Sequence, residues 1–210
     1  MTMRGRLAPR AGFLASLASV TLLCSVAAQQ GSLIISDFEG DRIEIRSGLA
    51  LWIFTDEQFG GTSHGSAEIV RPGAAGSHGA LRLKFQVTGD ARNPFASVWA
   101  MVAPQAAATD LSSYRGVRFH ARGKNPEAFT AGLVRYAGMP TRYQAPFKVL
   151  TEWSVVELPF EKFGELTLTG TLLAGAPALA PDGITSVGFS VVRELQGHYE
   201  LEVDNLEFYR

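Results

Sequence analysis

The chain has 210 residues, with 22 glycines, 10 prolines and 13 phenylalanines, and 19 basic against 20 acidic side chains. This length suits a single domain with extra segments, and abundant glycine, proline and aromatic residues favour short strands joined by turns. A nearly neutral charge without a run of lysine or arginine argues against nucleic acid as a partner.

The first 28 residues are predicted to be a secretory signal peptide. Three arginines in the first ten residues precede an uncharged apolar run, 11–26, and the small residues Val26 and Ala28 place the cleavage point after Ala28. An uncleaved membrane anchor is the alternative, although the run is short for a helix that needs about 20 apolar residues. A lipid-modified Cys24 is disfavoured by the bulky leucines before it. We therefore expect a periplasmic or secreted protein without membrane contact beyond the leader.

Residues 29–210 are predicted to form one domain, since no internal repeat and no linker interrupts them. Cleavage would remove the only cysteine and three of the 19 basic side chains, leaving a mildly acidic body. Such a chain forms no intramolecular disulfide, and its four scattered histidines do not make a Cys/His zinc site.

Alternating apolar and polar residues predict an all-β protein. The predicted strands are 32–38, 49–55, 68–71, 81–87, 96–102, 117–122, 129–136, 143–149, 153–158, 184–192 and 198–209. In 117–122 three apolar residues share one face and three basic ones the other, which is typical of a half-buried strand. One helical turn is expected at 159–163 and a long irregular loop at 164–182. Many short strands separated by turn residues indicate a sandwich or a barrel.

A series of short motifs runs in order along residues 37–209. They are Trp52-Ile-Phe-Thr-Asp56, Gly60-Gly61-Thr-Ser63, Asp110-Leu-Ser-Ser-Tyr-Arg-Gly116, Tyr143-Gln-Ala-Pro-Phe147, Trp153-Ser-Val-Val-Glu-Leu-Pro-Phe160, Ile184-Thr-Ser-Val-Gly-Phe189 and Gly197-His-Tyr-Glu-Leu-Glu-Val-Asp-Asn-Leu206. The series resembles the complex I intermediate-associated protein 30 family. This resemblance implies a galactose-binding-like jelly-roll β-sandwich and a role in protein interaction or complex assembly.

The opening Asp37-Phe38-Glu39 is also similar to the first strand of carbohydrate-binding modules, family 11 in particular. This second resemblance implies an alternative function, recognition of a glycan on the concave sheet face. The predicted leader differs from the mitochondrial members of the first family, and an exported protein would not meet their respiratory partner. We expect a monomer that binds a protein or a glycan.

No catalytic site is predicted. Gly61-Thr-Ser-His-Gly65 matches the Gly-x-Ser-x-Gly pattern of hydrolase nucleophiles, but no helix follows the serine, and that motif depends on a strand–turn–helix. The resemblance instead implies a structural loop packed near Trp52. Acidic residues in the segment Glu152–Glu165 show no pair marked for glycoside hydrolysis.

A structural calcium site is one candidate feature. In the carbohydrate-binding sandwiches that the chain resembles, the first and last strands lie side by side and hold calcium near their ends. Glu39, Asp41 and Asp204 would supply carboxylate oxygens, the ligands that calcium prefers, if the strands pair in this way. The alternative is a solvated strand edge whose charges discourage edge-to-edge pairing.

A ligand-binding face is the other candidate feature. Its proposed residues are Arg118, His120, Arg135, Tyr136, Arg142 and Tyr143. Sugar sites place aromatic planes against apolar ring faces and planar donors against hydroxyls, and tyrosine with arginine supplies both. The alternative is that these arginines keep an open sheet face soluble. Trp52, Trp99 and Trp153 are predicted to be core residues, because aromatic residues in apolar strands usually are.

Overall fold

The computed structural model describes residues 31–48, 50–192 and 195–210. Gly31–Arg210 form one compact unit. The predicted leader and its cleavage point lie outside the described residues, so both stay predictions. Within the described ranges, no helix is long and apolar enough to span a membrane.

The described residues form strands and short 3-10 turns, and they contain no α-helix. The strands are β1 (Leu33–Ser36), β2 (Trp52–Thr55), β3 (His64–Val70), β4 (Ala80–Val87), β5 (Ala96–Met101), β6 (Gly116–Gly123), β7 (Phe129–Tyr136), β8 (Pro140–Phe147), β9 (Ser154–Pro159), β10 (Gly164–Glu165), β11 (Ile184–Val191) and β12 (Gly197–Tyr209). The 3-10 turns are η1 (Asp56–Phe59), η2 (Ala74–Gly76), η3 (Pro104–Ala106) and η4 (Phe160–Lys162), the last where one helical turn was predicted.

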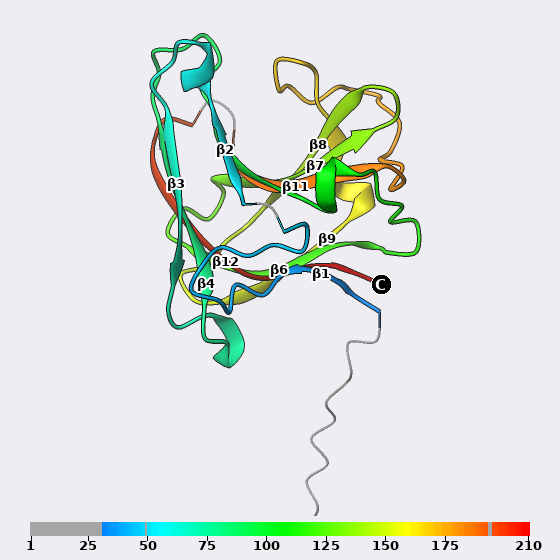
Figure 1. Ribbon diagram of the computed structural model, residues 1–210. Helices are drawn as coiled ribbons and strands as arrows, with labels where there is room; N and C mark the ends of the chain where they lie inside the picture. The colour runs from blue at the N-terminus through cyan, green and yellow to red at the C-terminus, as the bar shows by residue number, and fades with distance from the viewer. Residues whose placement is uncertain (1–30, 49, 193–194) are drawn as a thin grey trace, which may run out of the picture. The chain divides into compact units, whose positions relative to one another are not determined.

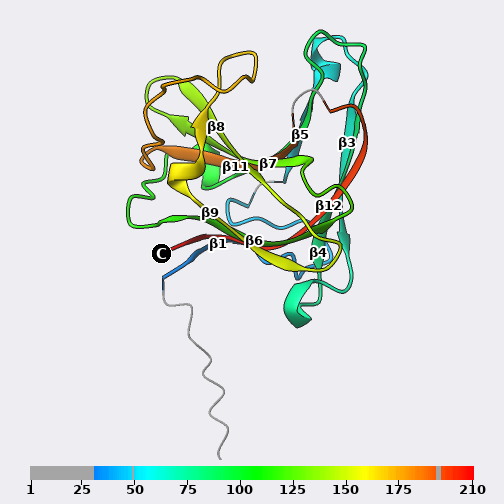
Figure 2. The same cartoon turned by 180° about the vertical axis from the view of Figure 1, so that it is seen from behind.

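Two antiparallel sheets face each other (Figures 1 and 2). The first, here called the terminal sheet, has the order β3-β4-β12-β6-β9, with β1 also paired to β12. The second, here called the groove sheet, has the order β10-β8-β7-β11-β5-β2. The predicted jelly-roll β-sandwich is confirmed, and so is the side-by-side pairing of the first and last strands, with Leu33 opposite Phe208.

The hydrophobic core fills the space between the two sheets. At its centre the ring of Phe119 from the terminal sheet lies 5.1 Å from Phe147 and 5.0 Å from Phe189, both on the groove sheet. Both contacts are edge-to-face, the arrangement that aromatic quadrupoles favour. The predicted alternation of β6 is confirmed, because Val117, Phe119 and Ala121 are fully buried.

Some boundaries differ from the prediction because pairing extends past the apolar residues. Strand β3 begins at His64, within a predicted loop, since β4 continues the ladder to the pair His64–Gln86. Strand β8 begins at Pro140, which lies opposite Tyr136 at the edge of a tight hairpin. Within the predicted loop 164–182, Gly164 and Glu165 form the short edge strand β10.

Replacing Phe119 by alanine is expected to lower the free energy of unfolding by about 3–5 kcal/mol, because it opens a cavity between the sheets. Phe59→Ala is the matched control: its side chain is 73% exposed and only its ring contacts with Phe54 and Phe95 are lost, so the expected loss is about 1 kcal/mol or less. Urea denaturation followed by circular dichroism measures both. Equal losses in the two variants would contradict this placement of the core.

Candidate functional site: a groove on the second sheet

The face of the groove sheet that points away from the core carries three cross-strand rows of side chains. The rows are Phe54, Ser97, Ser190 and Thr130; Trp52, Trp99, Gly188, Gly132 and Gln144; and Met101, Ser186, Val134 and Arg142. Alternate residues of each strand share a face, so these rows follow directly from the strand register. Eight of these residues line a groove on this face, namely Trp52, Phe54, Ser97, Trp99, Val134, Arg142, Gln144 and Ser190.

Trp99 forms the centre of the floor of this groove because its neighbours are glycines. A Cβ on Gly132 would lie 2.6 Å from the indole, and one on Gly188 would lie 2.7 Å from it. Because Gly132 on β7 and Gly188 on β11 have no side chains, the ring of Trp99 can lie across both strands. Trp99 is only 5% exposed, and its position is fixed by the sheet beneath it.

Polar groups on the floor form short hydrogen-bonded chains. The indole N–H of Trp99 donates to the Ser97 hydroxyl at 3.0 Å, and that hydroxyl donates to the carbonyl of Phe54 at 2.8 Å. Across the groove, the Gln144 amide donates to the Ser190 hydroxyl at 3.4 Å. The floor thus presents hydroxyl and amide groups next to two indole rings.

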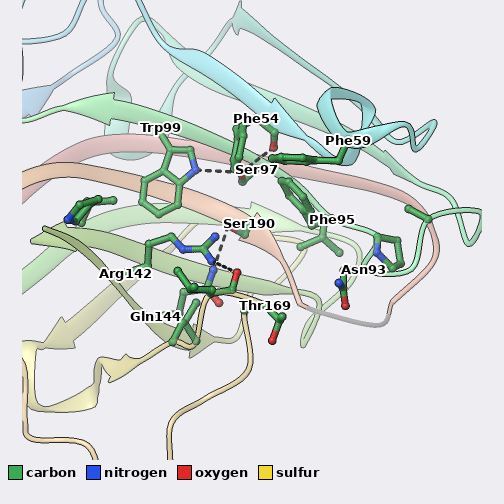
Figure 3. Close-up of a pocket in the computed structure, with 18 of the residues that line it drawn as sticks. Phe54, Phe59, Asn93, Phe95, Ser97, Trp99, Arg142, Gln144, Thr169 and Ser190 are labelled. Carbon is green, nitrogen blue, oxygen red and sulfur yellow. Dashed lines mark hydrogen bonds between the residues drawn. The ribbon is translucent and has the colours of Figure 1, made fainter.

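One wall of the groove is aromatic (Figure 3). Phe54 lies 5.9 Å from Phe59 and 5.0 Å from Phe95, measured between ring centroids. Phe59 extends from η1 with most of its ring in solvent. The enclosed volume is about 610 Å³, within the range of roughly 300–1,000 Å³ typical of small-ligand sites.

The opposite wall is formed by β8 and the segment after β10 (Figure 3). Here the Arg142 guanidinium donates from Nη2 to the carbonyl of Leu168 at 2.9 Å and to that of Thr167 at 3.4 Å. Burial lowers the pKa of this guanidinium from its ordinary value. Arg142 stays protonated nonetheless, because guanidinium groups in proteins do not lose their proton.

The aromatic wall is held in place by the buried carboxylate of Asp56. Its Oδ2 accepts hydrogen bonds from the Phe95 N–H at 2.9 Å and from the Ser63 hydroxyl at 2.6 Å, and its Oδ1 accepts one from the Ser63 N–H at 2.9 Å. A Cβ on Gly61 would overlap this carboxylate, so only glycine fits there. The predicted structural role of the Gly-Gly-Thr-Ser loop agrees with these contacts. Ser63 is fully buried, and strand β3 follows it.

The structure does not bring the six predicted ligand residues together. Arg118 and His120 lie on β6 of the terminal sheet, on the other side of the core from the groove. Arg118 is already ion-paired: its Nε donates to Glu207 at 2.6 Å, and its guanidinium lies 5.6 Å from the Tyr209 ring. The Nδ1 atom of His120 is buried and has no hydrogen-bond partner among the described residues.

The other four predicted residues lie on β7 and β8, but only Arg142 lines the groove. Tyr143, its neighbour, points to the opposite face and belongs to the core, where burial raises the pKa of its phenol. Arg135 donates to both carboxylate oxygens of Asp182, at 3.0 and 3.1 Å. Tyr136 is half exposed at the end of the hairpin. The expectation of one shared face is therefore wrong, because adjacent strand residues alternate between faces.

The tryptophans are placed differently from the prediction. Trp99 is buried as predicted, but it lies on the groove side of its sheet, and Trp52 beside it lines the groove while only partly buried. Trp153 is also only partly buried, and the Arg122 guanidinium lies 4.7 Å from its ring. Their i, i+2 spacing places Trp52 and Phe54 on the same face of β2, but because Ile53 between them is also apolar, the sequence does not show that this face points outward.

The three predicted calcium ligands each have a different partner. Asp204 accepts hydrogen bonds from the Ala74 N–H at 2.8 Å, from the Ser77 hydroxyl and from the Asn205 N–H. Glu39 accepts one from the His78 N–H, and Asp41 is ion-paired with Arg71. No group of three acidic, histidine or cysteine side chains suited to a metal occurs in the described part of the chain. As arranged, Asp204 and Glu39 hold the 73–79 turn and Asp41 pairs with Arg71 before it, so the three residues do not fit a calcium cage.

We expect Asp56→Ala to lower the free energy of unfolding by about 3 kcal/mol or more, because three donors, two of them in buried hydrogen bonds, lose their acceptor. Asp90→Ala is the control, since Asp90 accepts hydrogen bonds from Thr62 and Thr88 at the exposed end of the same loops. Thermal unfolding should show a much smaller shift for the control. A similar fall in melting temperature in both variants would show that Asp56 contributes no more to stability than the exposed Asp90.

Calcium binding by Glu39, Asp41 and Asp204 is tested by melting the protein with a chelator and with added calcium. A ligand that binds only the folded state raises the melting temperature by mass action. Because the carboxylates already have protein partners, we expect the melting temperature to stay the same under both conditions. A rise that depends on calcium and is lost in Asp204→Asn would instead establish the site.

Comparison with solved structures identifies carbohydrate-binding modules of the same fold. The family 11 module of cellulosomal cellulase Lic26A-Cel5E of Clostridium thermocellum has a TM-score of 0.64 and 17% identity, over 85% of this chain and 94% of that chain. The family 11 module in complex with a β-1,3-1,4-mixed-linked tetrasaccharide gives 0.61 and 17%, over 85% and 95%. The family 30 module of cellulosomal cellulase Cel9D-Cel44B gives 0.58 and 14%, over 84% and 95%.

At these identities the likeness shows the fold alone. No curated protein matches the chain. The sequence model of the complex I intermediate-associated protein 30 family, however, matches residues 18–203, which is most of the chain. Together with the two-sheet fold and the buried Asp56–Ser63 motif, this match shows that the chain belongs to the complex I intermediate-associated protein 30 family.

Proposed function

We propose that this protein is a non-catalytic binding module that holds a glycan in the groove of its second sheet. The observation that carries the proposal is the pairing of an aromatic wall, Phe54, Phe59 and Phe95, with a floor of hydroxyl, amide and indole groups. Sugar rings have apolar C–H faces and polar hydroxyl edges. A groove with both kinds of surface matches both parts of the sugar.

The binding energy would come from stacking and from hydrogen bonds. The exposed ring of Phe59 offers a flat apolar surface at the mouth of the groove, where a sugar can replace water. The Ser190 hydroxyl accepts from the Gln144 amide and keeps its own proton to donate, and the side-chain carbonyl of Gln144 can accept, so these two groups suit sugar hydroxyls. Half of the residues that line the groove lie on strands, so the floor of the groove needs little ordering on binding.

A protein-binding role, as the family name suggests, is the second candidate. Exposed apolar side chains favour it: Leu168 is 97% exposed, Met139 69% and Leu172 61%. They lie in the β7–β8 hairpin and in the segment after β10, next to the groove. Exposed apolar side chains that gather in one region often mark interaction sites.

The proposal also includes where the protein acts and in which oligomeric state. If residues 1–28 act as a leader, the module works in the periplasm or outside the cell, as a monomer. There it would meet polysaccharides, and the respiratory assembly partner implied by the family name would be absent.

Isothermal titration calorimetry with soluble oligosaccharides tests the proposed function. The panel includes the β-1,3-1,4-mixed-linked tetrasaccharide, because a protein of the same fold was solved with it. We expect saturable binding that Trp52→Ala weakens by about five- to tenfold, since loss of a ring in contact with the sugar removes on the order of 1–1.5 kcal/mol.

Trp153→Ala is the matched control, because this tryptophan lies next to the terminal sheet and outside the groove. It should leave the affinity unchanged. Binding that survives Trp52→Ala, or that Trp153→Ala removes, would place the glycan elsewhere. If no oligosaccharide binds while a protein partner co-purifies through Leu168 and Leu172, the second candidate replaces the first.

A further inference from the structure

We propose that the groove selects glycans that carry negative charge, as carboxylate or sulfate groups on the sugar, and that Arg142 is the residue that recognises the charge. The inference rests on the proposed function and names the ligand class of the same groove. It is based on the charges that line the groove and on the donors of one guanidinium.

The groove is positively charged although the chain as a whole is not. Two arginines, Arg92 and Arg142, line it, and no described lining residue is acidic. The full chain has 20 acidic and 19 basic side chains, so such a lining departs from the average composition. A site lined by one sign of charge attracts ligands of the opposite sign.

Arg142 has hydrogen-bond donors left over. Its Nη2 atom donates to the two carbonyls of Thr167 and Leu168, but Nε and Nη1 have no protein partner in the described ranges. Neither atom is among the buried polar atoms without a partner, which are His120 Nδ1 and Thr130 Oγ1. The free N–H groups of Arg142 are therefore not buried, and Arg142 itself lines the groove.

The charge of Arg142 is also unpaired. Every other arginine that the structure places on a sheet strand, namely Arg82, Arg118, Arg122 and Arg135, has a carboxylate partner, and among the described residues Arg142 has none. Its burial already lowers its pKa, which reflects the cost of removing the charge from water. An anionic ligand would supply the missing counter-charge in a site where water screens it only partly.

A carboxylate or sulfate group fits this donor set better than a neutral hydroxyl does. Guanidinium N–H groups lie in one plane and bind two oxygens of one anionic group at once. A neutral sugar offers single hydroxyls, which also need acceptors for their own protons. The acceptors on the floor are few, because the Ser97 hydroxyl already receives the Trp99 N–H, and the Ser190 hydroxyl receives the Gln144 amide.

Arg92 extends the same charge toward the mouth of the groove. It is exposed, lines the groove near the aromatic wall and forms no ion pair with the described residues. Because Arg92 and Arg142 lie on segments that bound opposite sides of the groove, a charged oligosaccharide could contact both at once.

The test uses three oligosaccharides of equal length in calorimetric titrations: cellotetraose as the neutral probe, tetragalacturonate as the carboxylate probe and a sulfated galactan tetrasaccharide as the sulfate probe. We expect at least one charged probe to bind about tenfold or more tightly than cellotetraose, as expected for charge-assisted hydrogen bonds. Its affinity should fall as salt is raised, because screening weakens the attraction. The charged probe that binds more tightly shows whether the groove prefers carboxylate or sulfate groups.

Variants assign the selectivity to Arg142. Arg142→Gln should weaken binding of the charged probe by about tenfold and change the affinity for cellotetraose by no more than about twofold. Arg142→Lys keeps the positive charge but loses the planar guanidinium, so its affinity for the charged probe should lie between those of the wild type and Arg142→Gln. Arg92→Gln, at an exposed position, should lower charged binding by a smaller factor. Lys148→Gln is the control, because Lys148 is exposed, pairs with Glu127 and lies outside the groove.

The outcomes separate this inference from the proposed function. Equal or tighter binding of cellotetraose would overturn the charge selectivity and leave glycan binding intact. Equal loss of all three probes in Arg142→Gln would also overturn it, because the residue would then only position the segment at Thr167 and Leu168. If none of the probes and no other glycan binds, the proposed function itself fails.

Discussion

The buried carboxylate of Asp56 is the interaction on which the groove depends. Asp56 follows β2 of the groove sheet, and its three hydrogen bonds reach Ser63, just before β3 of the terminal sheet, and Phe95, just before β5. One side chain therefore ties both sheets together where the chain crosses between them. It also fixes the backbone from which Phe59 and Phe95 extend, so the aromatic wall is built on a rigid support.

Strand periodicity made the fold predictable from the sequence. The apolar positions of β4 and β6, and of the first part of β12, recur every second residue, and each of these strands forms within one residue of its predicted range. The order of motifs from Trp52 to Leu206 gave the family as well. The ends of the strands were harder to predict. Strands β3 and β8 include residues such as Ser66 and Pro140, which are extended because they pair with the neighbouring strand and not because of their own sequence pattern.

The candidate site was predicted only at Arg142. Arg118 has the same local pattern of alternation, and nothing in the sequence says that it pairs with β12 and β9 in the terminal sheet and not with the groove sheet. Sheet membership arises from long-range pairing, which a single sequence does not display. Trp52 and Trp99 were missed for a related reason. Apolar residues on both faces of a strand look like core, although here one face forms the floor of a groove.

The contact between Trp99 and the bare backbone of Gly132 and Gly188 has a consequence for how this family member can change. Three strands share the indole, so a side chain gained at either glycine would push the ring upward and make the groove shallower. The depth of the groove therefore depends jointly on Trp99, Gly132 and Gly188, which are far apart in the chain. Family members that differ at one of these three positions would then have to differ at the others as well, and such linked variation would show in an alignment of the family.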